Sequence, residues 1–483
     1  VTIADGGLIL PEDATTQSVL IIAPSLKVDA PVEPVLNRQS SDLETNGFGT
    51  FVEGGVVNPI AAAWKQAYEG GSRRIYLMAL PGATDAERFA FLQEAMFGVL
   101  ADFSVDHVAV VGVYADQEVT FGAAPAATEG VTTEFTATGA SALVFPLTVA
   151  AGTSDTIKIG TATVTLEAKV YNTAALYLAE VNAELAGAGL ETKAEIVAGK
   201  LVLSQSTTFS LVTGTNAGTL AAGAAISTIR GNFALLAGQF AESQTLNHSA
   251  TLAYIGASAP AGNSLGQVKA KVDTLVAINN EYSGYVSVIA GAELGYILPG
   301  RSDYYFTNGV VTYAALVSTL RAESATTNKR VYGVAAMHYN LSLRQLNALT
   351  GNKYVTFRLK NNQVVVSDGI TTAPDLVVGG AKQSSDFTRL STLRITQTAA
   401  QLVRDLVEPF IGEPNRMPQY NALNATIKGG LEAMKAQGAI FDYRFTVVAR
   451  GGTLSEAVIT LELIPAFEMR KVSVNVTLRP YTA

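Results

Sequence analysis

The chain has 483 residues, a formal net charge of −8 and no cysteine. This length exceeds what one hydrophobic core supports, so several domains are expected, and the lack of cysteine excludes disulfides and thiolate metal sites. The acidic balance without a Lys/Arg cluster argues against nucleic-acid binding.

Only 15% of the residues are charged, against roughly 25% in a typical domain, whereas apolar residues make up 48% and the mean hydropathy is +0.26. No run approaches about 18 uninterrupted apolar residues, so no membrane span and no direct lipid binding are expected. A basic segment followed by an apolar core is missing at the N-terminus, so no secretory leader is expected. A surface this poor in charge indicates burial in an assembly.

The beginning of the chain alternates strand and helix patterns. Residues 1–16 are predicted to form an N-terminal arm. Helical spacing predicts helices over residues 59–68 and 85–103, the second capped by Asp85. Alternating strands and helices imply right-handed crossovers and a largely parallel sheet. Three continuous apolar runs are typical of strands buried on both faces: residues 18–24, 74–80 and 107–114.

At about residue 118 the composition shifts to Ala, Thr, Gly and Ser, with short strand patterns and one helix at 174–185. We expect a β-rich outer domain, residues 118–239, inserted into an α/β domain formed by residues 17–117 and 240–380. Exposed loops tolerate such insertions. The α/β pattern then resumes, with predicted strands at 251–257, 285–291, 355–359 and 363–366 and helices at 265–278, 312–321 and 342–349.

The C-terminal part reads as an α+β domain, residues 381–469, followed by a C-terminal arm, residues 470–483. Two helices are predicted at 388–410 and 420–437, and two strands at 441–449 and 457–463 form a hairpin. A last strand follows at 471–478. It places Val472, Val474, Val476 and Leu478 on one face and Ser473, Asn475, Thr477 and Arg479 on the other.

The sequence contains few patterns that are typical of catalytic or cofactor-binding sites. Ser264 lies in a G-x-S-x-G pattern, and Asp303 and His338 follow in the chain order of a hydrolase triad. Four residues separate the preceding strand from this motif, so a loop and a helix start are favoured, and a serine hydrolase stays the alternative. Without a phosphate-binding loop, no cofactor and no enzyme are expected. A surface adhesin built on the insert is a further alternative. Three histidines are too scattered for a metal site: His107, His248 and His338.

Two runs near the C-terminus resemble the C-terminal domain of contractile phage tail sheath proteins. They are RLSTLRITQTAAQLVRDLVEPFIGEPN (389–415) and NALNATIKGGLEAMKAQGAIFDYRFTV (421–447). The resemblance extends over nearly the whole chain, although Ile370 stands where the family often has an arginine before threonine. It implies a structural subunit that forms stacked hexameric rings around a tail tube, linked by exchanged β-strands. Contraction from a metastable extended state then drives the tube through the host envelope.

The resemblance also implies partners and a location. The partners are other copies of the chain, the tail tube protein, and the baseplate and tail terminator proteins. The location is the tail sheath of a virion, assembled in the host cytoplasm. A phage-derived bacteriocin or another contractile injection system is the alternative.

The resemblance further assigns roles to residues. Residues 379–380 and 465–468 are expected to flex. Donated strands are expected to carry Lys471, Val472, Val474, Val476 and Leu478, and also Ile3, Leu8 and Leu10. The accepting hairpin is expected to use Phe441, Tyr443, Phe445, Val447, Val458 and Leu461. The tube is expected to face Arg416, Lys428, Glu432 and Lys435.

Overall fold

The computed structural model divides the chain into two compact units, one of Val1–Gln117 with Phe233–Ala483 and one of Glu118–Asn232. The insert therefore ends seven residues before the expected boundary at residue 239. The structure describes residues 17–121, 129, 131–139, 142–152, 154–159, 161–206, 210–212, 223–224, 226–247, 249–260, 264–275, 284–291, 293–378, 381–412, 417–449 and 457–468.

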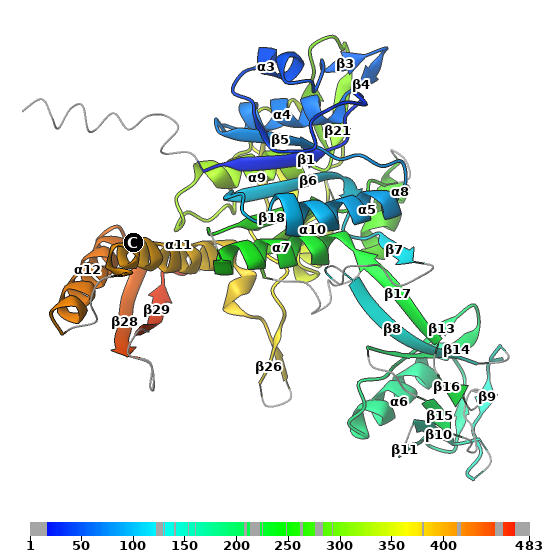
Figure 1. Cartoon of the computed structure of the whole chain (residues 1–483). Coiled ribbons are helices and arrows are strands. Elements are labelled where there is room, and N and C mark those ends of the chain that lie inside the picture. Colours follow the sequence, from blue (N-terminus) through cyan, green and yellow to red (C-terminus); the bar gives the residue numbers. More distant parts are fainter. Residues whose placement is uncertain are drawn as a thin grey trace, which may run out of the picture. The chain divides into compact units, whose positions relative to one another are not determined.

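The first unit is built on a seven-stranded sheet in the order β2-β5-β1-β6-β18-β19-β23 (Figure 1). All neighbours pair in parallel except β2 with β5. The predicted parallel sheet is confirmed, because its strands are the continuous apolar runs of the sequence. Their bounds are β1 (Val19–Ala23), β2 (Val35–Leu36), β5 (Ile75–Ala79), β6 (His107–Tyr114), β18 (Leu252–Gly256), β19 (Val286–Ile289) and β23 (Tyr354–Val355).

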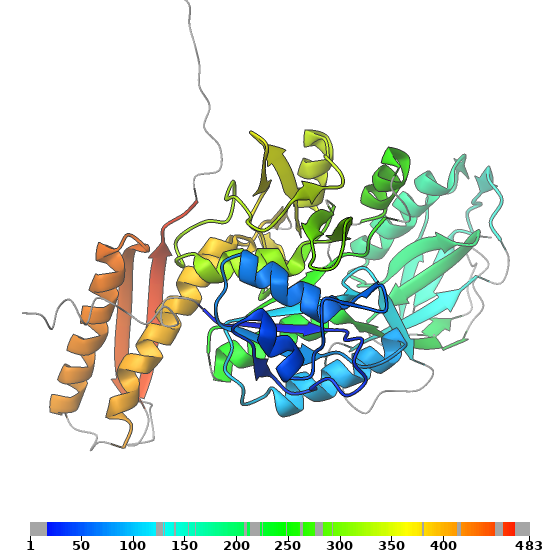
Figure 2. The same cartoon turned by 90° about the horizontal axis from the view of Figure 1, so that it is seen from above.

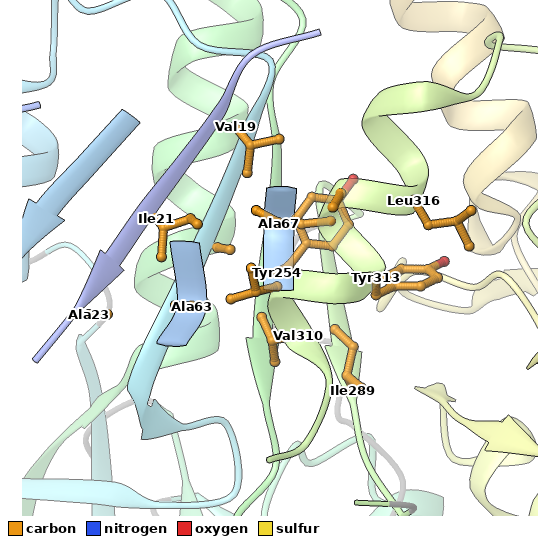
Figure 3. Close-up of a cluster of buried hydrophobic side chains, with 14 of the residues drawn as sticks. Val19, Ile21, Ala23, Ala63, Ala67, Tyr254, Ile289, Val310, Tyr313 and Leu316 are labelled. Atoms are coloured by element: carbon orange, nitrogen blue, oxygen red, sulfur yellow. The ribbon is translucent and has the colours of Figure 1, made fainter. Parts of the chain in front are cut away.

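Helices cover this sheet. α4 (Pro59–Glu69) and α9 (Val310–Thr319) pack against β1 and its neighbours, and Figure 3 shows their side chains meeting Val19 and Ile21. α7 (Phe233–Asn247) packs on β6, β18 and β19, and its Phe233 meets Phe89 of α5 (Asp85–Glu94). The sequence pattern does not predict α7, because this helix is apolar on nearly all sides and its helical period is hidden.

Several predicted boundaries are wrong in detail. The helix over 85–103 is α5 followed by a π-helix, η1 (Ala95–Val99), and its cap is Thr84, whose hydroxyl accepts from Glu87 N–H, rather than Asp85. The strand over 355–359 splits into β23 and β24 (Phe357–Lys360), and β24 pairs with β25 (Gln363–Val366). Asn361 and Asn362 between them have φ of 50° and 57°, as a two-residue hairpin turn requires.

The flexible linker predicted around residues 379–380 lies outside the described residues. The strands on either side of it pair with each other, β26 (Leu376–Val378) with β27 (Ala381–Gln383). Lys353 anchors the base of this hairpin, since its Nζ lies 3.0 Å from Asp375 Oδ1 and donates to Ala373 O. The remaining elements of the first unit are α3 (Ser40–Thr45), β3 (Val52–Glu53), β4 (Val56–Val57), α8 (Leu265–Thr274), β20 (Leu294–Ile297), β21 (Tyr304–Thr307), β22 (Ala336–Met337), α10 (Leu343–Gly351) and η2 (Asp386–Thr388).

The second unit is rich in strands, as the sequence predicts. A five-stranded antiparallel sheet has the order β13-β14-β8-β17-β7, and a four-stranded sheet has the order β11-β10-β15-β16. α6 (Ala174–Gly187) buries Tyr177, Val181 and Leu185 in its core. The strands are β7 (Glu118–Phe121), β8 (Val131–Thr138), β9 (Leu147–Thr148), β10 (Thr156–Ile159), β11 (Ala162–Thr165), β12 (Val170–Tyr171), β13 (Lys193–Val197), β14 (Lys200–Gln205), β15 (Ser210–Val212), β16 (Gly223–Ala224) and β17 (Ile226–Asn232).

The C-terminal elements are two helices and a hairpin, as predicted, and Figure 2 shows them side by side. The expected third strand at 471–478, the N-terminal arm and Arg416 lie outside the described residues. Among the described helices, none combines the length and the hydropathy needed to cross a bilayer. The elements are α11 (Leu390–Val407), η3 (Glu408–Phe410), α12 (Met417–Ala436), β28 (Ile440–Ala449) and β29 (Ala457–Pro465).

Candidate functional site

The candidate site is the β28–β29 hairpin with its two helices. The strands pair antiparallel over their whole length, with a bulge at Phe441, which is 65% exposed. Period two in the sequence puts alternate side chains on opposite faces. The face toward α11 and α12 carries Tyr443, Phe445, Val447, Ile459, Leu461 and Leu463.

The six predicted acceptor residues therefore do not share one face. Tyr443, Phe445, Val447 and Leu461 point toward the helices, where each stays half-buried. Phe441 and Val458 are exposed, and Val458 pairs with exposed Val448. On the same outer face Arg444 lies opposite Glu462, a favourable cross-strand charge pair.

A groove of about 540 Å³ lies between α11 and β29. Two residues of β29 line this groove, Ile459 and Leu461, and within the described residues β29 pairs with β28 alone. Ile411 beside it is 77% exposed. An apolar groove next to a free strand edge is suited to an added strand. Six apolar residues line it: Ala400, Val403, Val407, Ile411, Ile459 and Leu461. The other lining residues are polar or charged: Gln401, Arg404, Asp405 and Glu408.

Polar contacts tie α12 to β28 at the other side of the hairpin. Lys435 Nζ lies 2.9 Å from Asp442 Oδ1, and this pair lowers the pKa of Asp442 and raises that of Lys435. Tyr443 donates to Glu432 Oε1 at 2.7 Å; desolvation and then this bond raise the pKa of Tyr443 to about 12. Of the predicted tube-facing residues, Glu432 and Lys435 thus contact the hairpin, and Lys428 is exposed.

Three polar side chains of α11 join the site to the α/β sheet. Gln397 Nε2 donates to Thr245 Oγ1 and Thr251 O, both at 3.1 Å. Arg404 donates to the carbonyls of residues 245 and 246 at the end of α7. Arg394 is 4% exposed and donates to Val317 O and Leu320 O at the end of α9. The sequence puts both arginines off the apolar stripe, and nothing local distinguishes them from solvated residues.

A buried polar cluster lies next to Arg394. His107 contacts Tyr254 OH through Nδ1 at 2.9 Å and Gln17 Oε1 through Nε2 at 2.8 Å. Gln17 lies two residues before the start of β1 and donates its backbone N–H to Ser318 O. Desolvation, and then the charge of Arg394, hold the pKa of His107 well below its ordinary value. The start of β1, the sheet and α11 therefore meet at one buried junction.

Within the described residues, side chains pack closely at the place where α/β sheets usually bind ligands. The strand order reverses between β1 and β6, and ligands of such folds lie outside the carboxyl ends at that point. Here Pro24 follows β1 and packs on Gly112, where a Cβ atom would come within 2.5 Å of its ring. Arg88 Nη1 also donates to Gly112 O at 3.0 Å. Side chains of the protein fill this position.

A polar cluster that the sequence analysis missed lies after β6 and β18. Ser258 donates to Asp116 Oδ2 at 2.7 Å, and Lys271 of α8 donates to both residues. Burial raises the pKa of Asp116, but the hydrogen bonds from Lys271 and Ser258 outweigh it and lower that pKa overall. Lys271 contacts both Asp116 and Ser258, so the cluster ties two loops to α8.

The structure separates the three residues of the hydrolase interpretation. Ser264 is the N-cap of α8, and its side chain forms a capping box with Gln267. Asp303 pairs with Arg301, and His338 lies 3.4 Å from Glu293. No described contact joins the three. His248 lies outside the described residues, and within the described ones no three metal-ligating side chains group together.

Neither a family model nor a curated protein matches this sequence. Among solved structures, the chain is similar to a chain of the anti-feeding prophage (AFP) baseplate, with 13% identity, a TM-score of 0.52 and coverage of 96% of this chain and 94% of that chain. A chain of the AFP helical sheath in the contracted state is 12% identical, with a TM-score of 0.51 and coverage of 96% of this chain and 93% of that chain. A chain of the AFP baseplate in the contracted state is 11% identical, with a TM-score of 0.53 and coverage of 96% of this chain and 94% of that chain.

These similarities cover nearly the full length of both chains, at an identity that establishes the fold. The protein has the fold of a sheath protein of contractile injection systems. The resemblance read from the C-terminal sequence is confirmed at this level.

Proposed function

We propose that this protein is the structural subunit of a contractile sheath. The observation that carries the proposal is the full-length likeness in fold to a chain of the AFP helical sheath. The low charge of the sequence supports it, since a subunit buried in a lattice needs fewer charges than a free one. Copies stack as hexameric rings around a tube, and heterologous contacts that do not close generate the helix.

Neighbouring subunits are linked by exchanged strands. The free edge of β29 and the apolar groove beside it accept a strand from another copy, with residues 471–478 as the donor and residues 1–16 as a second donor. The donor strand's valines fill the groove, and its backbone pairs with β29. The roles of the donor and acceptor residues are part of this proposal. So are the roles of the residues that face the tube, among them Lys428.

Contraction from a metastable extended lattice supplies the work, so the mechanism uses no nucleotide. The subunit contacts a tail tube protein, a baseplate and a tail terminator. The particle is a phage tail or a related injection machine, assembled in the host cytoplasm. The proposal includes both kinds of particle, because the similar solved structures come from an anti-feeding prophage.

Negative-stain microscopy of the purified full chain tests the function. We expect helical tubes or short stacks of rings whose formation rises with concentration. A monodisperse monomer at high concentration contradicts the proposal.

A matched pair of variants tests the donated strand. Val474→Asp places a charge on the apolar face of the strand, and we expect loss of tubes with an unchanged far-UV circular dichroism spectrum. Asn475→Asp adds the same charge on the polar face and should still assemble. Normal tubes from Val474→Asp refute residues 471–478 as the donor.

A further inference from the structure

We propose that in the unassembled subunit residues 471–478 pair with β29 of their own chain and fill its groove. Assembly then replaces this strand by the equivalent strand of a neighbour, which makes it a domain swap. The inference rests on the proposed function and adds the state of the free subunit. The swap accounts for how a subunit with an open strand edge stays dispersed before assembly.

The groove lies on the side of β29 that a returning strand reaches. It is lined by α11, by Glu408 and Ile411 just after this helix, and by Ile459 and Leu461 of β29. The chain leaves β29 at Pro465, and Ala466 N donates to Ala439 O at 3.0 Å, which fixes the end of the strand. Residues 466–469 then form a four-residue connection, a length common in β-hairpins. A tight antiparallel return is therefore within reach of the chain.

The side-chain pattern together with a four-residue loop defines the proposed register. With Met469 as the last loop residue, Arg470 lies opposite Pro465, and Val474 lies opposite Leu461. Val472 then lies opposite Leu463 and Val476 opposite Ile459, so the valines extend the apolar face that β29 turns toward α11.

On the other face, Ser473 lies beside Glu462 and Asn475 beside Thr460. A slip by one residue would put the valines in water and the polar residues in the groove. Both the loop length and the alternation agree on this register.

The free subunit needs such a cover. β29 has nine residues and an unpaired edge next to exposed Ile411. Long exposed strand edges associate without control, and proteins usually cover them. A strand tethered by four residues has a far higher effective concentration at the groove than a strand of another copy. Self-pairing therefore dominates in dilute subunits, and the exchange occurs where a growing sheath holds neighbours in place.

A designed disulfide tests the inference. The chain has no cysteine, so Thr460→Cys with Asn475→Cys creates one exposed pair on the outer face. Directly opposite residues have Cβ atoms about 4.5–5.5 Å apart, which suits a disulfide. We expect mild oxidation of dilute full-length subunits to close an intramolecular bond, seen as monomer mass with loss of both free thiols. The oxidised protein should lose tube formation, and reductant should restore it.

Thr446→Cys with Asn475→Cys is the matched control. Thr446 lies opposite Thr460 on β28, one strand further, at about 9.5 Å from residue 475 in the proposed register, so it should stay reduced. Oxidation of assembled Thr460→Cys/Asn475→Cys tubes should give a ladder of covalently linked subunits.

The outcomes separate the two proposals. Free thiols in dilute subunits together with a ladder in tubes overturn self-pairing and leave the sheath function standing. Assembly that continues from the oxidised monomer overturns the swap. An intramolecular bond without tubes under any condition supports self-pairing and contradicts the sheath function, and the absence of both bonds contradicts both.

Discussion

Arg394 is a charged residue whose burial joins two parts of one unit. Its guanidinium lies under α11 and donates to two carbonyl oxygens at the end of α9. Desolvation lowers the pKa of Arg394, and Tyr254 and Tyr313 partly offset this effect. A charged donor to backbone carbonyls is directional, so it sets how α11 leaves the sheet.

We expect Arg394→Met to lower the free energy of unfolding by about 2–3 kcal/mol, because a hydrogen-bonded charge is lost and two carbonyls lose their donor. Urea unfolding followed by circular dichroism measures this change. Arg444→Met on the exposed face of the hairpin is the matched control and should cost about 0.5 kcal/mol or less. Equal effects of the two variants contradict the role of Arg394.

His107 makes the stability depend on pH. Its folded pKa is depressed, so the folded protein keeps it neutral while the unfolded chain binds a proton below about pH 6.5. The contribution is complete above that pH and is lost as the pH falls toward the folded pKa, at up to about 1.4 kcal/mol per pH unit.

His107→Gln removes the titrating group. We expect the free energy of unfolding of this variant to fall less between pH 7 and pH 5.5 than that of the wild type, even though the variant is less stable at pH 7. Urea titrations at both pH values measure the difference. If the free energy of unfolding of the variant falls as much between pH 7 and pH 5.5 as that of the wild type, other groups cause the pH dependence.

At the scale of elements, the contact of β1 with β6 depends on a residue without a side chain. Gly112 has φ of 84°, and Pro24 after β1 occupies the space of its missing Cβ. The strained backbone alone costs a residue with a side chain about 1–3 kcal/mol. The same contact lies where sheets of this topology usually bind ligands.

We expect Gly112→Ala to destabilise the protein by at least about 2 kcal/mol, because backbone strain and the contact with Pro24 add. Gly429→Ala is the control, since this exposed helical glycine of α12 has no neighbouring atom within 4 Å of a built Cβ. It should stabilise the protein by about 0.5–1 kcal/mol. Thermal unfolding of the two variants checks both signs.

At the scale of the whole molecule, the insert is a separate unit with its own core. Its first and last residues, Glu118 and Asn232, are paired neighbours on β7 and β17. We expect the chain without residues 118–232, closed by a short Gly-Ser linker, to keep the folded first unit. Circular dichroism and a cooperative thermal transition measure this.

A second excision tests the boundary. Removing residues 118–239, as the composition alone suggests, also deletes the first half of α7 with buried Phe233 and Leu236. This variant should lose cooperative unfolding. If the longer excision folds as well as the shorter one, α7 is dispensable and the boundary at Asn232 is wrong.

The sequence by itself determined the local periods and the chain order of most elements. Apolar runs such as residues 18–24 and the alternation in residues 441–447 identify strands, because burial on one or both faces sets the pattern of apolar residues. The C-terminal motifs gave the resemblance, and the fold comparison confirmed it. The alternation in residues 471–478 predicts that Val474 and Asn475 lie on opposite faces of a strand.

Only the tertiary structure decided which polar residues are buried and which segments meet. Arg394 is buried because α9, some 75 residues earlier, supplies its carbonyl partners. His107 contacts Tyr254 on β18 and Gln17 in the segment before β1. α7 escaped notice because burial on nearly all sides leaves no period. Contacts between segments far apart in the chain decide which residues are buried and which strands pair. A single sequence does not show these contacts.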